Sequence, residues 1–134
     1  MTRILLVDDN FEIRKALRNL LERHQDWCIC GEATNGREAI ETFEKVKPDV
    51  VLLDFKMPEM NGLEAAREMS RRAQVPILMV SMFLSDQLAA EAHKAGVRAT
   101  CPKERIGCVV QAVEALLRDD EPRRGYASRS LKSS

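Results

Sequence analysis

Short apolar runs alternate along the chain with longer segments whose apolar residues recur every three or four positions. The short runs are bounded by polar residues, glycine or proline, which is typical of strands buried inside a sheet. They predict five strands, at Ile4–Val7, Trp27–Gly31, Val50–Leu53, Ile77–Val80 and Val97–Cys101.

The segments between these runs predict amphipathic helices, because their apolar residues fall on one side at helical spacing. In the last segment Val109, Val113 and Leu116 belong to one continuous apolar stripe. Pro48 is expected to end the second helix, and Gly96 is expected to close the fourth. The predicted helices run from Phe11 onward and at Arg37–Val46, Gly62–Arg72, Ser85–Ala95 and about Glu104–Arg118.

Strands that alternate with helices predict an α/β fold, with a parallel sheet covered by helices on both faces. A length of 134 residues suits one domain. We expect this domain to occupy residues 1–119. Residues 120–134 carry the polar and basic stretch EPRRGYASRSLKSS and are expected to form a linker or disordered tail. Contact of this short tail with nucleic acid is a weaker alternative.

Composition gives no sign of a charged partner or a membrane. Lys plus Arg and Asp plus Glu both number 21, so any charge-driven function must be local. No stretch approaches the roughly 18 apolar residues of a membrane span. The N-terminal stretch MTRILLVDD reaches a pair of aspartates before the apolar core of a signal peptide could form. These two observations predict a cytoplasmic protein. The four cysteines are expected to be reduced. Zinc or redox chemistry at Cys28 and Cys30 is an alternative that lacks further ligands at a recognisable spacing.

Polar residues follow the ends of four of the predicted strands. In a parallel sheet the carboxyl ends of the strands share one edge, where ligands bind. A single polar residue there is ordinary, since strand ends are wet. Five polar residues at one edge favour a ligand-binding site. These residues are Asp8, Asp9, Asp54, Ser81 and Lys103.

The types of these residues suggest phosphoryl chemistry. Crowded carboxylates repel one another, which implies a divalent cation, and oxygen ligands suit Mg²⁺ together with phosphate oxygens. Ser81 could donate a hydrogen bond to a phosphoryl oxygen, and Lys103 could neutralise another. The nucleophile would then be an aspartate, since carboxylates form aspartyl phosphates.

The segments ILLVDD, VVLLDFKMPEMNG and PILMVS, with the lysine after the fifth strand, resemble the receiver domain of two-component response regulators. The resemblance covers about residues 2–118, and the motif DxxMPxMxG is highly specific for it. It implies a flavodoxin-like, doubly wound (βα)5 fold with strand order 2-1-3-4-5. It also implies a signalling domain rather than an enzyme, with self-phosphorylation and autodephosphorylation as its only reactions.

The same resemblance implies a role for each site residue. Asp54 would accept a phosphoryl group from the phosphohistidine of a histidine kinase or phosphotransfer protein, with Ser81 and Lys103 contacting that group. The implied Mg²⁺ ligands are Asp9, Asp54, the backbone carbonyl of Lys56 and, through water, Asp8.

The stretch GEATNGREAI further resembles receivers that precede a LuxR-type helix-turn-helix domain. Transcription regulation and DNA contact would need such an output domain, which this sequence lacks. The chain is therefore expected to be either a stand-alone receiver or a fragment cut after Arg118. The sequence leaves open whether the protein forms a homodimer.

Two departures from the family pattern keep an alternative open. The family usually has Tyr or Phe at the switch position three residues before the lysine, where this chain has Thr100, and a small residue where it has Met82. A degenerate receiver that acts only as an interaction module is therefore the alternative. A haloacid-dehalogenase-like phosphatase is disfavoured, since Asn10 stands where its second acid is required.

Overall fold

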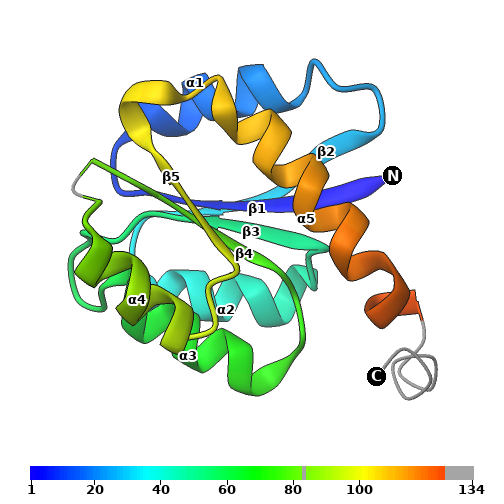
Figure 1. Cartoon of the computed structure of the whole chain (residues 1–134). Helices are drawn as coiled ribbons and strands as arrows, with labels where there is room; N and C mark the ends of the chain where they lie inside the picture. Colours follow the sequence, from blue (N-terminus) through cyan, green and yellow to red (C-terminus); the bar gives the residue numbers. More distant parts are fainter. Residues whose placement is uncertain (83, 126–134) are drawn as a thin grey trace.

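The computed structural model describes residues 1–82 and 84–125, which form a sheet between two layers of helices (Figure 1). The strands are β1 (Thr2–Val7), β2 (Trp27–Ala33), β3 (Val50–Leu53), β4 (Ile77–Ser81) and β5 (Ala99–Pro102). The helices are α1 (Phe11–Leu21), α2 (Gly36–Val46), α3 (Gly62–Arg72), α4 (Asp86–Lys94), the 3-10 turn η1 (Lys103–Arg105) and α5 (Cys108–Gly125).

The five strands are parallel and lie in the order β2-β1-β3-β4-β5. The predicted fold class and strand order are confirmed. From β1 the chain passes outward to β2 and then returns across β1 to β3, so the chain order reverses between β1 and β3. The carboxyl ends of these two strands flank the crevice where ligands bind in open α/β sheets.

Alternate residues along each central strand point into opposite layers, as the pleat of a strand requires. Helices α1 and α5 cover one face of the sheet, and α2, α3 and α4 cover the other (Figure 1). In β1, Leu5 and Val7 join the core under α2 and α3, whereas Ile4 and Leu6 join the core under α1 and α5. Both faces are buried, which explains why these strands read as unbroken apolar runs.

The fifth strand begins two residues later than predicted. Val97 is buried, but its N–H donates to the carbonyl of Ala92 in α4, so it completes the helix end instead of pairing with β4. Gly96 closes α4 as predicted, with a positive φ of 103°. A Cβ at this glycine would stand 2.0 Å from Ser70 Oγ, so a side chain is excluded by space as well as by backbone conformation.

The last helix also differs from its predicted bounds. Residues Lys103–Arg105 form the 3-10 turn η1, and α5 starts only at Cys108. Gly107, a poor helix former, separates the two segments. At the other end the backbone stays helical to Gly125, beyond the predicted end at Arg118. Residues 126–134 of the predicted tail lie outside the described residues, and the boundary at residue 119 stays a prediction.

No helix in residues 1–82 or 84–125 combines the length and the apolar character needed to cross a bilayer.

Candidate functional site

The turn after β1 fixes Asp8 by its backbone and its side chain. The N–H of Asp8 donates to the carbonyl of Ala33 at the end of β2, and Asp8 Oδ1 accepts from the N–H of Asn10 at 2.9 Å. Asn10 in turn caps α1 by accepting the N–H of Ile13 at 3.0 Å. Asp8 is therefore 2% exposed, whereas its neighbour Asp9 stands in solvent.

Asp54 sits where β3 ends, because the following loop folds back against its backbone. The N–H of Asp54 donates to the carbonyl of Val7 in β1, and the N–H of Gly62 donates to the carbonyl of Phe55. A Cβ at Gly62 would stand 2.2 Å from the carbonyl oxygen of Asp54. Only glycine permits this approach, which keeps the strand end and the start of α3 together and leaves Asp54 5% exposed.

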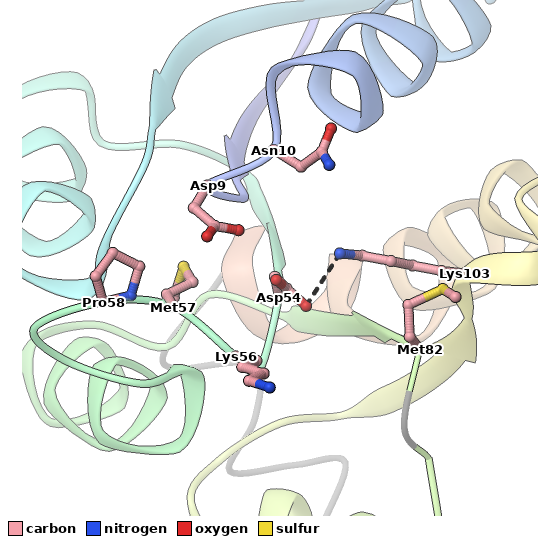
Figure 2. A pocket seen from close by; sticks show the side chains of 8 residues that line it. All are labelled: Asp9, Asn10, Asp54, Lys56, Met57, Pro58, Met82 and Lys103. Carbon is pink, nitrogen blue, oxygen red and sulfur yellow. Dashed lines mark ion pairs between the residues drawn. The ribbon is translucent and has the colours of Figure 1, made fainter.

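Lys103 follows the edge strand β5, and its side chain contacts the carboxylates that follow β1 and β3. The Nζ of Lys103 lies 2.7 Å from Asp8 Oδ2 and 3.2 Å from Asp54 Oδ1. The side chain of Lys103 is 8% exposed, so this cation serves two buried carboxylates at once. Figure 2 shows its long side chain reaching across to Asp54.

One lysine does not balance the negative charge at this edge. Burial and the neighbouring Asp8 raise the pKa of Asp54 from its ordinary 3.8 to about 6, although Lys103 opposes this rise. Burial alone would lower the pKa of Lys103, but its hydrogen bond to Asp8 and the charge of Asp54 outweigh burial and raise it. Lys103 therefore stays charged, and burial together with the charge of Asp8 makes ionisation of Asp54 unfavourable.

This arrangement predicts how stability without metal depends on pH. Between pH 4 and pH 6 the folded state holds a proton on Asp54 that the unfolded state has released, so stability falls as pH rises through about 6. A rise in pKa from 3.8 to about 6 corresponds to about 3 kcal/mol at pH 8. We expect Asp54→Asn to be more stable than wild type at pH 8 by up to this amount and to lose the advantage at pH 4. Urea unfolding at both pH values measures it, and an equal difference at both would contradict the assignment.

A cavity of about 450 Å³ opens beside Asp54. The loop after β3 forms one wall, and the residue after β4 forms another (Figure 2). Met82 there lines the cavity and is 54% exposed. The lining residues are Asp9, Asn10, Asp54, Lys56, Met57, Pro58, Met82 and Lys103.

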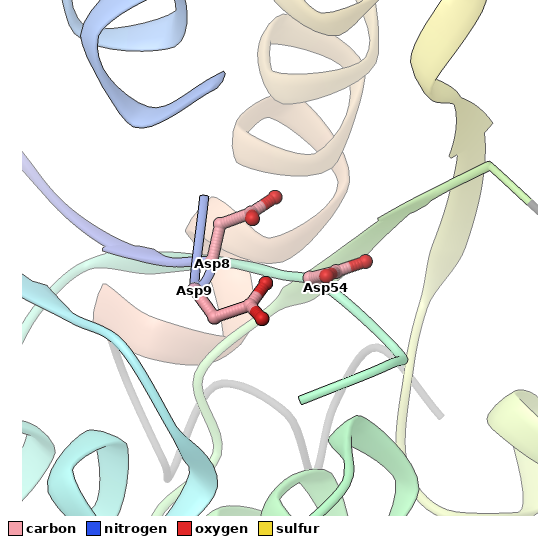
Figure 3. A group of neighbouring side chains, drawn as sticks. All are labelled: Asp8, Asp9 and Asp54. Atoms are coloured by element: carbon pink, nitrogen blue, oxygen red, sulfur yellow. The ribbon is translucent and has the colours of Figure 1, made fainter. Parts of the chain in front are cut away.

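Three carboxylates lie close together, those of Asp8, Asp9 and Asp54, and the last two line the cavity (Figure 3). One oxygen from each lies within 4.8 Å of the others, close enough to share a cation. The donor atoms are all oxygen, which suits a hard divalent cation. The raised pKa of Asp54 indicates an excess of negative charge that such a cation would offset. The residues therefore fit Mg²⁺. Cys28 and Cys30 belong to no comparable group within the described part of the chain.

Besides Asp8, two predicted residues do not line the cavity. Ser81 ends β4 and is 1% exposed, and it is not among the residues that line the cavity. Thr100 pairs with Met79 in the middle of β5 and is half-buried. The roles of Ser81 in phosphoryl contact and of Thr100 as the switch position stay predictions.

The comparisons with known proteins agree with this geometry. The model of the response regulator receiver domain matches residues 4–114. The chain belongs to this family. Among solved structures, this receiver domain is similar to a LuxR-family two-component response regulator from Aurantimonas sp. SI85-9A1, with a TM-score of 0.85 and 31% identity over 89% of this chain and 86% of that chain.

Curated relatives of this receiver domain differ in how much chain they have outside the shared part. The transcriptional regulatory protein YdfI of Bacillus subtilis is 35% identical over 98 residues, which are 73% of this chain and 46% of YdfI. A protein-glutamate methylesterase of Alkalilimnicola ehrlichii is 44% identical over 63% of this chain and 22% of its own length. Chemotaxis protein CheY of Thermotoga maritima is 38% identical over 72% of this chain and 80% of CheY. The chain thus spans less than half of two of these relatives and most of the third.

Sequence reasoning missed two residues of this receiver domain. Asn10 lines the cavity and holds Asp8 Oδ1 through its backbone N–H. The signal was present, since an asparagine directly before an apolar helical pattern is a typical N-cap. Arg14 donates to the backbone carbonyl of Asp8 at 2.8 Å, and the helical pattern assigned this residue only to a polar face.

Proposed function

We propose that this receiver domain accepts a phosphoryl group onto the carboxylate of Asp54 and that Mg²⁺ assists the transfer. The observation that carries the proposal is the position of Asp54, a buried carboxylate at a strand end that lines an open cavity beside Lys103 and Asp9. Family membership supports a receiver, and the cavity supplies the space that a phosphoryl group needs.

The carboxylate is suited to act as a nucleophile at neutral pH. With a pKa of about 6, Asp54 is mostly ionised at pH 7 yet more basic than an ordinary aspartate. In the transfer an oxygen of Asp54 forms a bond to phosphorus while the bond from phosphorus to the donor atom breaks. With a phosphohistidine donor this is the P–N bond, whose electron pair stays on the imidazole.

Lys103 and the acidic residues have separate roles in this proposal. Lys103 already contacts one oxygen of Asp54, so its ammonium group lies where the charge of the phosphoryl oxygens would develop. Ser81, at the end of β4, would donate its hydroxyl to another phosphoryl oxygen. Asp9, Asp54 and the Lys56 carbonyl would hold Mg²⁺, with Asp8 acting through water. When bound, Mg²⁺ supplies positive charge that offsets the phosphoryl oxygens and orients them.

The partner that supplies the group would be a histidine kinase or a phosphotransfer protein. Two exposed apolar side chains near the site, Phe11 at the start of α1 and Met82 after β4, are 55% and 54% exposed. They are available to a partner that approaches the cavity. Control of transcription would require a further output domain. The relative YdfI, which is a transcriptional regulatory protein, supports the proposal that this receiver domain works with one.

The direct test is incubation of the protein with acetyl phosphate, with and without Mg²⁺. We expect incorporation of one acid-labile phosphoryl group per chain, dependent on Mg²⁺ and abolished by EDTA. Continuous release of phosphate without accumulation would indicate a phosphatase instead. No label with Mg²⁺, from acetyl phosphate or from a phosphorylated histidine kinase, would favour the degenerate receiver.

A further inference from the structure

Two arginines of α1 share one carboxylate of the neighbouring strand. Arg14 Nε lies 2.9 Å from Glu32 Oε1, and Arg18 Nε lies 2.7 Å from Glu32 Oε2. The arginines are four residues apart, so they stand on the same side of the helix. Glu32 pairs with Leu6 of β1 near the end of β2. One glutamate thus attaches α1 to the sheet through residues near both ends of the helix.

Arg14 makes a second contact that Arg18 does not share among the described interactions. Its Nη1 donates to the backbone carbonyl of Asp8 at 2.8 Å, and its guanidinium carbon lies 5.7 Å from the centre of the Phe11 ring. The side chain of Arg14 is only 12% exposed. This guanidinium therefore lies between Glu32 and the turn that carries the acidic residues.

This contact completes the fixation of Asp8. Its N–H is held by Ala33, Oδ1 by the N–H of Asn10 and Oδ2 by Lys103. The carbonyl of Asp8, held by Arg14, belongs to the peptide that leads directly into Asp9. Asp9 itself is exposed. The orientation of the peptide before it therefore sets the Cα–Cβ direction from which its carboxylate extends.

We propose that Arg14 is a positioning residue for the acidic cluster, which it serves by holding the Asp8–Asp9 peptide in the orientation that presents both carboxylates to a divalent cation. Glu32 anchors the guanidinium from behind. This inference rests on the proposed function, since it assumes that the cluster binds Mg²⁺. Partners that orient metal ligands from outside typically change metal affinity by 10- to 100-fold when they are replaced.

The chain offers a matched pair of variants. Arg14→Lys keeps the positive charge but loses the planar fork that reaches Glu32 and the Asp8 carbonyl together. Arg18→Lys makes the same chemical change on the same helix and against the same glutamate, without touching the turn after β1. A difference between the two variants therefore reports on the contact with Asp8.

The experiment is a titration with MgCl2, followed by the backbone amide chemical shifts of Asp9 and Asn10. We expect the half-saturating Mg²⁺ concentration to rise about tenfold in Arg14→Lys and to stay within about twofold of wild type in Arg18→Lys. Melting temperatures without Mg²⁺ should fall in both variants, since each weakens one pairing with Glu32, and further in Arg14→Lys, which also loses the contact with the Asp8 carbonyl. Glu32→Gln, which releases the anchor but keeps Arg14, should raise the half-saturating concentration by at least about threefold.

Labelling by acetyl phosphate provides a second measurement. In Arg14→Lys the Mg²⁺ dependence should shift to higher concentration, whereas the rate at saturating Mg²⁺ should stay within about twofold, because Asp54 and Lys103 are untouched. Equal weakening of Mg²⁺ binding in the two lysine variants would overturn the inference, as would unchanged binding in Arg14→Lys or Glu32→Gln. A wild type that does not bind Mg²⁺ would overturn the proposed function as well, so the two failures are distinguishable.

Discussion

Replacement of Asp54 by asparagine is expected to reduce phosphoryl labelling at least a hundredfold while the fold persists. The amide keeps nearly the shape of the carboxylate but lacks the charged oxygen that attacks phosphorus. The cavity contains another carboxylate, Asp9, but it follows a different strand and is exposed. Radiolabel retained after brief incubation with acetyl phosphate and Mg²⁺ measures the effect.

Asp9→Asn is the informative comparison for this prediction. It also removes one carboxylate from the cluster, so it should raise the Mg²⁺ concentration needed for labelling without abolishing labelling at high Mg²⁺. Circular dichroism confirms that each variant is folded. If Asp54→Asn were labelled at the wild-type rate, Asp54 would not be the phosphoacceptor.

Removal of the Lys103 ammonium is expected to destabilise the protein strongly at pH 8. Lys103→Met keeps a long, flexible side chain but leaves Asp8 and Asp54 as buried carboxylates without their cation. Removing one partner from a buried charge pair typically costs about 3 to 5 kcal/mol. Urea unfolding without Mg²⁺ measures this loss, and the labelling rate should fall by about a hundredfold in the same variant.

Lys45→Met is the control, since it removes a lysine that is exposed on α2. It should change stability by less than about 0.5 kcal/mol. Adding Asp54→Asn to Lys103→Met should recover part of the lost stability at pH 8, because one of the two unpaired charges is gone. Stability of Lys103→Met equal to that of Lys45→Met would show that the buried contacts of Lys103 give no net stabilisation.

The architecture could be predicted because its signals are local. Val50–Leu53 is apolar at every position, as a strand with two covered faces must be, and its predicted bounds are those of β3. Errors arose where local backbone geometry, and not the apolar pattern, decided the boundary. Val97 looks like a strand residue in sequence, yet its N–H completes α4. The break between η1 and α5 at Gly107 was hidden by an apolar stripe that continues across it.

The site was predictable as far as strand ends determine it. The rule that parallel strands end at one edge placed Asp8, Asp54 and Lys103 together, and the contacts of 2.7 and 3.2 Å bear this out. Sequence could not tell that the pKa of Asp54 is raised, since that depends on burial and on where Lys103 points. It also could not reveal Arg14, because an arginine that faces solvent and one that bridges two strand ends have the same helical spacing.

The most direct test of the central claim is to locate the phosphoryl group by mass spectrometry. The protein is labelled with acetyl phosphate and Mg²⁺, reduced with borohydride, which converts an aspartyl phosphate into homoserine, and then digested. We expect homoserine at position 54 and aspartate at positions 8 and 9. Homoserine at another aspartate, or none in a protein that carries acid-labile phosphate, would contradict the assignment of Asp54 as the phosphoacceptor.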